Sequence, residues 1–204
     1  MQHSQRARRP RTFPLPLPLP LPLVLVAAMT VTLVTGCGYN TIQSMDERVN
    51  QAQGQIETQL QRRADLIPNL VNTVRGVAKQ ETTVYNSIAN ARARLSGAVQ
   101  SGDVGQMAQA NAAVSQGLGR LLAIVENYPQ LRSSESFQQL QAQLEGTENR
   151  IAVARQDYNT AVGDFNSYIR RFPYNMTAKM FGMDKSRKYF EAEAEARRPP
   201  PVQF

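Results

Sequence analysis

The stretch IETQLQRRADLIPNLVNTV, residues 56–74, decides the fold because its apolar residues return at helical spacing and no strand-like alternation competes with them. The same stripe begins at Ile42 and continues to Leu95. Near its start, Ser44 is followed three residues later by Glu47, which matches a capping box and predicts that the helix begins there. The stripe consists of Ile42, Met45, Val49, Ala52, Ile56, Leu60, Ile67, Leu70, Val74, Val77, Val84, Ile88 and Leu95.

Pro68 lies inside this stripe without turn residues beside it, and a proline in that setting more often kinks a helix than ends it. We therefore expect one long, bent helix over residues 44–96, which would reach roughly 80 Å if it were straight. A full break at Pro68, which would give two helices, is the alternative.

Two further helical segments are predicted by their caps and stops. Asp103 is placed to cap a second helix, which ends before Pro129. Ser133 or Ser134 is placed to cap a third helix, which ends before Pro173. Because short connections make consecutive helices antiparallel neighbours, the sequence predicts an all-α fold: an elongated antiparallel up-down bundle of three long helical segments, or four if the first divides.

The N-terminal region has the pattern of an export signal that ends in a lipid-attachment site. An apolar run of roughly twelve residues, Leu23 to Val34, has the size of a secretory core rather than of a membrane span. The small residues Thr35 and Gly36 then precede Cys37, the arrangement that a lipoprotein signal peptidase recognises. We expect cleavage before Cys37 and lipidation of its thiol, and the alternative is a lone buried cysteine near an uncleaved helix. The basic residues before the apolar run are Arg6, Arg8, Arg9 and Arg11.

This pattern divides the chain into four segments. Residues 1–36 are expected to be a signal peptide that is removed, and residues 37–43 a lipid-anchored linker. Residues 44–172 form the helical bundle, and residues 173–204 a C-terminal extension that is partly disordered. Within the signal peptide, Pro14 to Pro22 alternate with leucine and are expected to be extended, because each proline removes a backbone donor.

Most of the positive charge belongs to the leader. The formal net charge of the whole chain is +7, and removal of the four leader arginines lowers it to +3. The basic residues that remain form no cluster interleaved with aromatic residues, so we expect no nucleic-acid partner. The length that remains after cleavage suits a single domain with a real core.

The scarcity of histidine and cysteine excludes several classes of enzyme. The only histidine is His3, in the leader, and the only cysteine is the one expected to carry lipid. Zinc sites built on histidine or cysteine, Ser-His and Cys-His nucleophile systems and redox disulfides are therefore excluded. The sequence also contains no glycine-rich phosphate loop. We expect no catalytic residue, no metal site and no cofactor, and a weak hydrolase that uses only carboxylates is the enzymatic alternative.

Two charged residues, Arg63 and Glu148, fall on the apolar stripes, each one helical turn from an apolar residue on either side. We expect both side chains to point inward and to pair across the interface between the first and third helices. The reason is that an unpaired buried charge would lower the stability by several kcal/mol. Separate side chains that reach to solvent are the alternative. Such a pair would set the register of the helices and would not catalyse.

Two stretches carry a resemblance to a known family. Residues 61–76, QRRADLIPNLVNTVRG, and residues 146–159, GTENRIAVARQDYN, are similar to the LemA family, and the likeness covers nearly the whole chain after the leader. The resemblance implies an antiparallel helical bundle at the outside of the cytoplasmic membrane or at another envelope surface, with no established catalytic residues. Two departures accompany it: many relatives carry a plain transmembrane anchor where this chain has Cys37, and Gln53 stands where a tryptophan is common.

These observations predict a non-enzymatic lipoprotein of the bacterial cell envelope, exported and held at a membrane by its lipid. Its long helices would act as a scaffold or adaptor for other membrane proteins. One alternative is an accessory subunit of an envelope enzyme or the carboxylate-only hydrolase, and another is a structural protein that assembles as a homo-oligomer. Gly38, rather than an aspartate, follows the cysteine and favours delivery to the outer membrane if the cell has one.

Overall fold

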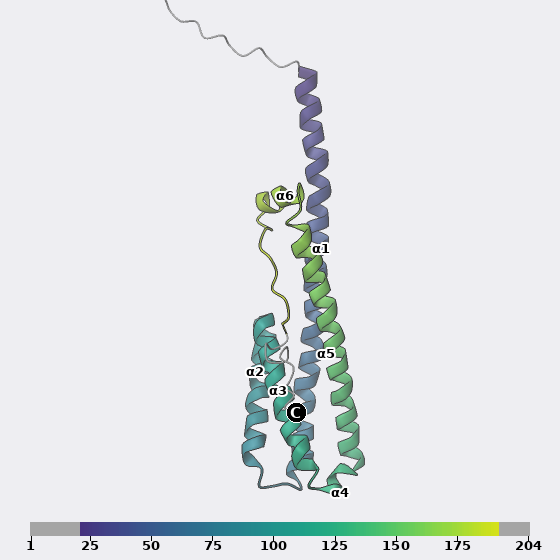
Figure 1. Ribbon diagram of the computed structural model, residues 1–204, viewed down its shortest axis with the longest axis vertical. Coiled ribbons are helices and arrows are strands. Elements are labelled where there is room, and N and C mark those ends of the chain that lie inside the picture. Colours follow the sequence, from purple (N-terminus) through teal and green to yellow (C-terminus); the bar gives the residue numbers. More distant parts are fainter. Residues whose placement is uncertain (1–20, 192–204) are drawn as a thin grey trace, which may run out of the picture.

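The computed structural model describes residues 21–191, and for residue 21 and residues 23–37 it describes only the backbone. Over this part of the chain every regular element is a helix, and the helices pack into an elongated bundle, which confirms the predicted all-α fold (Figure 1). The basic leader and residues 192–204 lie outside the described part. The helices are α1 (Leu21–Arg75), α2 (Thr82–Ser101), α3 (Val104–Val125), α4 (Pro129–Arg132), α5 (Glu135–Tyr168) and α6 (Tyr174–Met180).

α1 begins earlier than the sequence predicted. It runs without interruption through Ser44, so the prediction of a capping box there is wrong. The backbone amides that follow Ser44 bond to the preceding helical turn, which is present, and therefore need no cap. Residues 37–43, expected to be a linker, also belong to α1. Pro22, expected in an extended stretch, lies in the first turn of α1, where a proline has no helical hydrogen bond to lose.

The first long helix ends at Arg75, so the prediction of one helix to residue 96 is wrong, and so is the alternative of a break at Pro68. Residues 76–81 form a turn instead, and Val77, expected on the apolar stripe, is exposed. The Tyr85 hydroxyl donates to the carbonyl oxygen of Ala78 at 2.7 Å, which holds the turn closed. Folding back here lets α2 pack against both α1 and α3, whereas a continuous helix would have projected beyond its partners.

The core follows the predicted stripes. α1 packs along α5, and α2 packs antiparallel to α3 (Figure 1). Both predicted caps are confirmed: Asp103 accepts from the backbone amide of Gln106 at 3.0 Å, and Ser134 accepts from that of Phe137 at 3.4 Å. The largest fully buried side chains are Tyr85, Tyr158, Phe137, Ile42, Ile56, Leu60, Ile67, Leu70, Ile88, Leu95, Met107 and Leu121.

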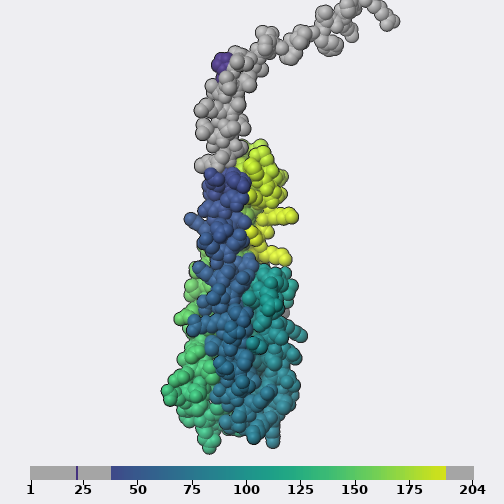
Figure 2. All heavy atoms as spheres, turned by 180° about the vertical axis from the view of Figure 1, so that it is seen from behind, coloured from purple at the N-terminus to yellow at the C-terminus, as the bar shows by residue number. Residues whose placement is uncertain are grey.

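The chain after α5 returns onto the bundle. α6 packs against α1, and residues 183–191, which contain no helix, run back along α5 toward the α2–α3 hairpin (Figure 1). Phe190 near the end of this segment is only 3% exposed. In Figure 2 these yellow residues lie beside the dark blue part of α1 that follows Cys37, with the teal α2 and α3 below them. The described part of the C-terminal extension is therefore packed against the bundle.

No helix in residues 21–191 combines the length and the hydropathy that a membrane span needs.

Candidate functional site

Arg63 of α1 is the centre of a polar cluster that joins three helices. Its side chain is 5% exposed. Nη1 donates to Asn111 Oδ1 on α3 at 2.7 Å, and Nη2 donates to Ser115 Oγ on the same helix at 3.1 Å. Nη1 also forms an ion pair with Glu148 of α5. Burial lowers the pKa of Arg63 from its usual value, and the negative charge of Glu148 opposes that shift.

The structure thus brings Arg63 and Glu148 together, but it does not bury them equally. The side chain of Glu148 is 48% exposed, so the expectation that both charges point inward is wrong for this residue. The physical reason is its place on α5, where water reaches one side of the carboxylate and reduces the desolvation that ion pairing must offset. The buried guanidinium compensates with amide and hydroxyl partners on α3, which the sequence analysis did not identify.

A second polar contact explains how Pro68 is tolerated inside α1. A proline has no amide hydrogen, so the carbonyl oxygen of Ala64, four residues earlier, loses its helical donor. Arg92 of α2 donates from Nε to that oxygen at 2.8 Å. The proline therefore creates an acceptor that ties α2 to α1.

Two asparagines of α5 hold the C-terminal segment by its backbone. Asn159 donates from Nδ2 to the carbonyl oxygen of Phe190 at 3.1 Å and accepts from the Phe190 amide at 2.8 Å. Asn166 makes the same pair of bonds with Arg187, at 2.9 Å and 2.8 Å. The guanidinium of Arg187 in turn pairs with Asp46 of α1 at 2.7 Å. Each asparagine thus supplies the donor and the acceptor that a neighbouring β-strand would supply.

The grooves of the described surface hold few reactive groups, and the richest of them is lined by Glu57, Arg62 and Asp65 of α1. The one between α1 and α5 has a volume of about 410 Å³, and Asp157 is the only carboxylate among its lining residues. The described residues include no cluster of histidine, cysteine, aspartate or glutamate that could hold a metal ion. Asp103 has a lowered pKa because the backbone amide of Gln106 donates to it, which is the chemistry of a helix cap. The remaining lining residues of the groove are Gln55, Thr58, Gln59, Asn149, Arg150, Val153 and Ala154.

Cys37, the predicted lipidation site, lies within α1, and its side chain is outside the described part. The next residue, Gly38, is buried. A Cβ atom at Gly38 would lie 2.9 Å from Cδ1 of Tyr174 in α6, so the helices meet there at a separation that favours glycine. Packing against α6 thus reaches the residue next to the cysteine.

Comparison with known proteins gives the family. The model of the LemA family matches residues 52–204. The chain belongs to the LemA family. Among the relatives of this LemA protein, magnetosome proteins MamQ 1 and MamQ 2 of Paramagnetospirillum magneticum are each 27% identical over 176 residues, covering 75% of this chain and 64% of theirs.

Magnetosome protein MamQ of Magnetospirillum gryphiswaldense is 25% identical over 179 residues, covering 76% of this LemA chain and 66% of its own length. This LemA chain therefore spans less than two thirds of the length of each of these relatives.

Proposed function

We propose that this LemA protein is a non-enzymatic lipoprotein of the bacterial cell envelope, exported by residues 1–36 and anchored to a membrane through lipidated Cys37. The observation that carries the proposal is the position of Cys37. It follows a basic and apolar leader with small residues before it, and it directly precedes Gly38, which is buried against α6. The anchor and the bundle would then be joined by helix, with no flexible linker between them.

The polar clusters support a structural role rather than catalysis. Arg63, Arg92 and the two asparagines of α5 all bind groups of the protein itself. Their positions fix the relative placement of α1, α2, α3, α5 and the C-terminal segment. A catalytic site would need such groups to converge on space that a substrate could occupy.

The shape of the bundle supports a scaffold or adaptor for other membrane proteins. From Gly38 to Arg75, α1 spans about 55 Å, so the bundle would present its long sides well beyond the lipid surface. Val153 on α5 is 59% exposed at the edge of the groove between α1 and α5. We place the contact with a membrane-protein partner at this groove.

The anchoring is tested by intact mass and membrane fractionation of the full chain expressed in bacteria. Wild-type protein is expected to lose residues 1–36, gain the mass of acyl chains and stay with the membranes, whereas Cys37→Ser loses both the acyl mass and the cleavage. A matched control adds Ser44→Cys to Cys37→Ser, because a cysteine without the preceding small residues restores neither. Retention of the complete leader and of an unmodified thiol in the wild type would contradict the anchor.

The scaffold role is tested by crosslinking within these membranes. Because lipid consumes the native thiol, Val153→Cys would carry the only free thiol and accept a photoreactive crosslinker. We expect a discrete adduct with a membrane protein at Val153→Cys and none at Val77→Cys, another exposed valine at the far end of the bundle. Absence of any adduct at both positions would contradict the scaffold role while leaving the anchor intact.

A further inference from the structure

Four large apolar side chains are gathered at the end of the bundle that holds α6. Phe172, Met176, Met180 and Phe181 are exposed over 49–79% of their surface. Single exposed apolar residues are ordinary, but a cluster of them marks a surface that contacts a membrane or another molecule. Met176 and Met180 are one helical turn apart and share the outer face of α6, opposite the buried Thr177 and Ala178.

α6 is fixed beside Gly38 and Tyr39 of α1. Tyr174 of α6 meets Gly38 at the close approach already described, and it stacks on Tyr168 of α5 with ring centroids 4.3 Å apart. Just beyond α6, the ring of Phe181 lies 4.5 Å from that of Tyr39. The exposed apolar cluster is thus held next to the residue that follows Cys37.

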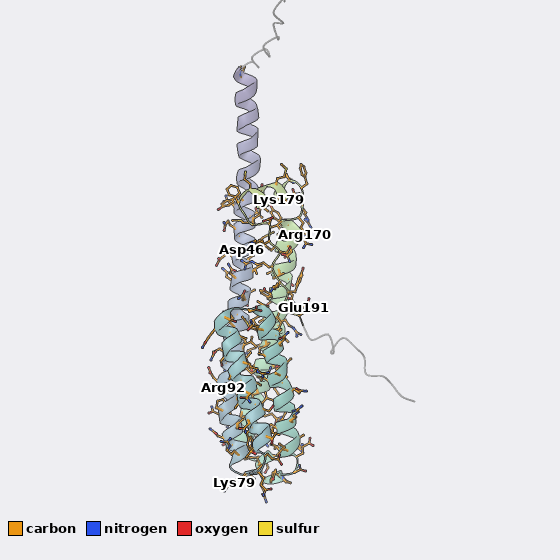
Figure 3. All side chains as sticks on the ribbon, turned by 90° about the vertical axis from the view of Figure 1, so that its left-hand side faces the viewer. Asp46, Lys79, Arg92, Arg170, Lys179 and Glu191 are labelled. Atoms are coloured by element: carbon orange, nitrogen blue, oxygen red, sulfur yellow. The ribbon has the colours of Figure 1, made fainter. Side chains whose placement is uncertain are left out.

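The same end of the bundle is cationic. Arg171, Lys179 and Lys185 are exposed, and neither ion pair of the described residues involves them. Figure 3 shows Lys179 and Arg170 at the α6 end, with Lys79 at the opposite end. Between residues 169 and 189 the only acidic residue is Asp184, against six basic ones: Arg170, Arg171, Lys179, Lys185, Arg187 and Lys188.

We propose that α6 and the preceding Phe172 form a membrane foot: Phe172 and the outer face of α6, with Met176 and Met180, insert into an anionic lipid surface, and Arg171 and Lys179 bind the lipid headgroups. The inference rests on the proposed function in one respect, that Cys37 holds the chain at a membrane. Apolar side chains on a short helix flanked by cations match the chemistry of a bilayer interface. A second copy of this chain would present the same cations and would repel them.

The foot would give the bundle a fixed orientation. A lipid on Cys37 alone lets the domain swing about one point, whereas α6 adds a second point of contact that is rigidly packed on α1 and α5. Several weak membrane contacts also act together, because the second binds at a high effective concentration once the first has formed.

The natural absence of tryptophan allows a direct test. Met176→Trp places a single fluorophore on the foot, and Val77→Trp, also at an exposed apolar position, places one at the other end, about 55 Å away. Both variants are expressed from the complete sequence, purified in their cleaved and lipidated form, and reconstituted into vesicles of phosphatidylcholine and phosphatidylglycerol, with and without brominated acyl chains. We expect brominated lipid to reduce the emission of Met176→Trp about twofold and to leave that of Val77→Trp unchanged.

A charge variant tests the headgroup contact in the same background. Adding Arg171→Glu and Lys179→Glu to Met176→Trp is expected to abolish most of the quenching in vesicles that contain phosphatidylglycerol. The matched control adds Lys79→Glu and Arg132→Glu, two exposed cations at the far end, and retains the quenching. Met180→Trp, a second position on the same face, reports independently if Met176→Trp does not fold.

The outcomes separate the foot from the anchor. Protein that stays with the vesicles but shows no quenching at either foot position overturns the foot and leaves the anchor standing. A blue-shifted emission that brominated lipid does not quench would mean that protein, such as a second copy, covers the face, which also overturns the proposal. Protein that fails to stay with the vesicles at all overturns both the anchor and the foot.

Discussion

The two ends of the bundle are stabilised by different kinds of contact. In the distal part, which comprises α2, α3, α4 and residues 53–75 and 135–156, helices bury apolar stripes against one another. In the proximal part, residues 38–52 and 157–191, α2 and α3 are absent and the C-terminal segment takes their place. Gln53 marks the boundary, because its Nε2 donates to the carbonyl oxygen of Gly102, beyond the last residue of α2, at 3.1 Å.

The difference follows from what each partner must satisfy. A helix satisfies its own backbone groups, so two helices need only complementary apolar faces. The segment 183–191 has no such internal bonds, so side chains of α5 must supply them. Asn159 and Asn166 are seven residues apart, about 10 Å along a helix, and the residues that they bind are three apart, also about 10 Å in an extended chain.

The largest expected effect lies in the distal part. Arg63→Ala should lower the free energy of unfolding by about 2–4 kcal/mol, because it leaves a cavity and removes the donors of Asn111 and Ser115. Arg63→Met fills much of the same space but supplies no donor, so it should restore only the part of the loss that comes from the cavity. Urea unfolding followed by circular dichroism measures both. Equal stability of Arg63→Ala and wild type would contradict the structural role of the cluster.

A smaller and local effect is expected in the proximal part. Asn166→Ala removes both bonds to the backbone of Arg187 and should accelerate hydrogen exchange of that amide about tenfold, which corresponds to about 1.4 kcal/mol. The urea midpoint of the distal part should not change. Asn149→Ala, an exposed asparagine on the same helix, is the control. A matching loss of global stability would show that the two parts unfold together.

The hydrogen bond from Arg92 to the Ala64 carbonyl oxygen, which Pro68 leaves without a helical donor, predicts a coupling of about 1 kcal/mol between Pro68 and Arg92. Pro68→Ala returns an amide to α1, which can then bond to Ala64 without help from α2. Arg92→Ala should therefore destabilise the native chain and have little effect in the Pro68→Ala background. A double-mutant cycle on the unfolding free energies measures this, and additive effects would contradict the account of the proline.

The smallest expected effect comes from adding one methyl group to a glycine of α1, either in the distal part or in the proximal part. Gly54→Ala meets nothing within 4 Å and should raise the free energy of unfolding by about 0.5–1 kcal/mol, since alanine favours helix. Gly38→Ala meets the Tyr174 ring at 2.9 Å, so we expect that gain to be lost as α6 shifts. Thermal unfolding of the two variants gives the difference, and equal gains would show that α6 does not pack tightly on α1.

Sequence reasoning succeeded where apolar periodicity and caps determine the structure. The stripes, the cap at Asp103 and the cap at Ser134 all follow from local spacing. The turn at residues 76–81 was missed although Gly76 stands at its start, because the stripe continues across it in sequence while Val77 turns out to solvent. Local spacing reports propensity, whereas tertiary packing decides where a long helix folds back.

The polar contacts were harder to foresee. Arg63 and Glu148 can be identified from the sequence because they are charges on an apolar stripe. Nothing in the spacing indicates that Asn111 and Ser115 complete the cluster. The asparagines of α5 bind a segment about twenty or thirty residues away in sequence that has no periodicity of its own. Partners of this kind are fixed only when the whole fold brings them together.

Native-state hydrogen exchange of the wild-type chain at increasing urea tests the division into two parts most directly. We expect the amides of Arg187 and Phe190 to exchange through an opening at least about 2 kcal/mol less costly than that of Leu60 and Tyr85, and with a weaker dependence on urea. The same opening free energy and the same urea dependence at all four amides would contradict the division, because the molecule would then unfold as one unit.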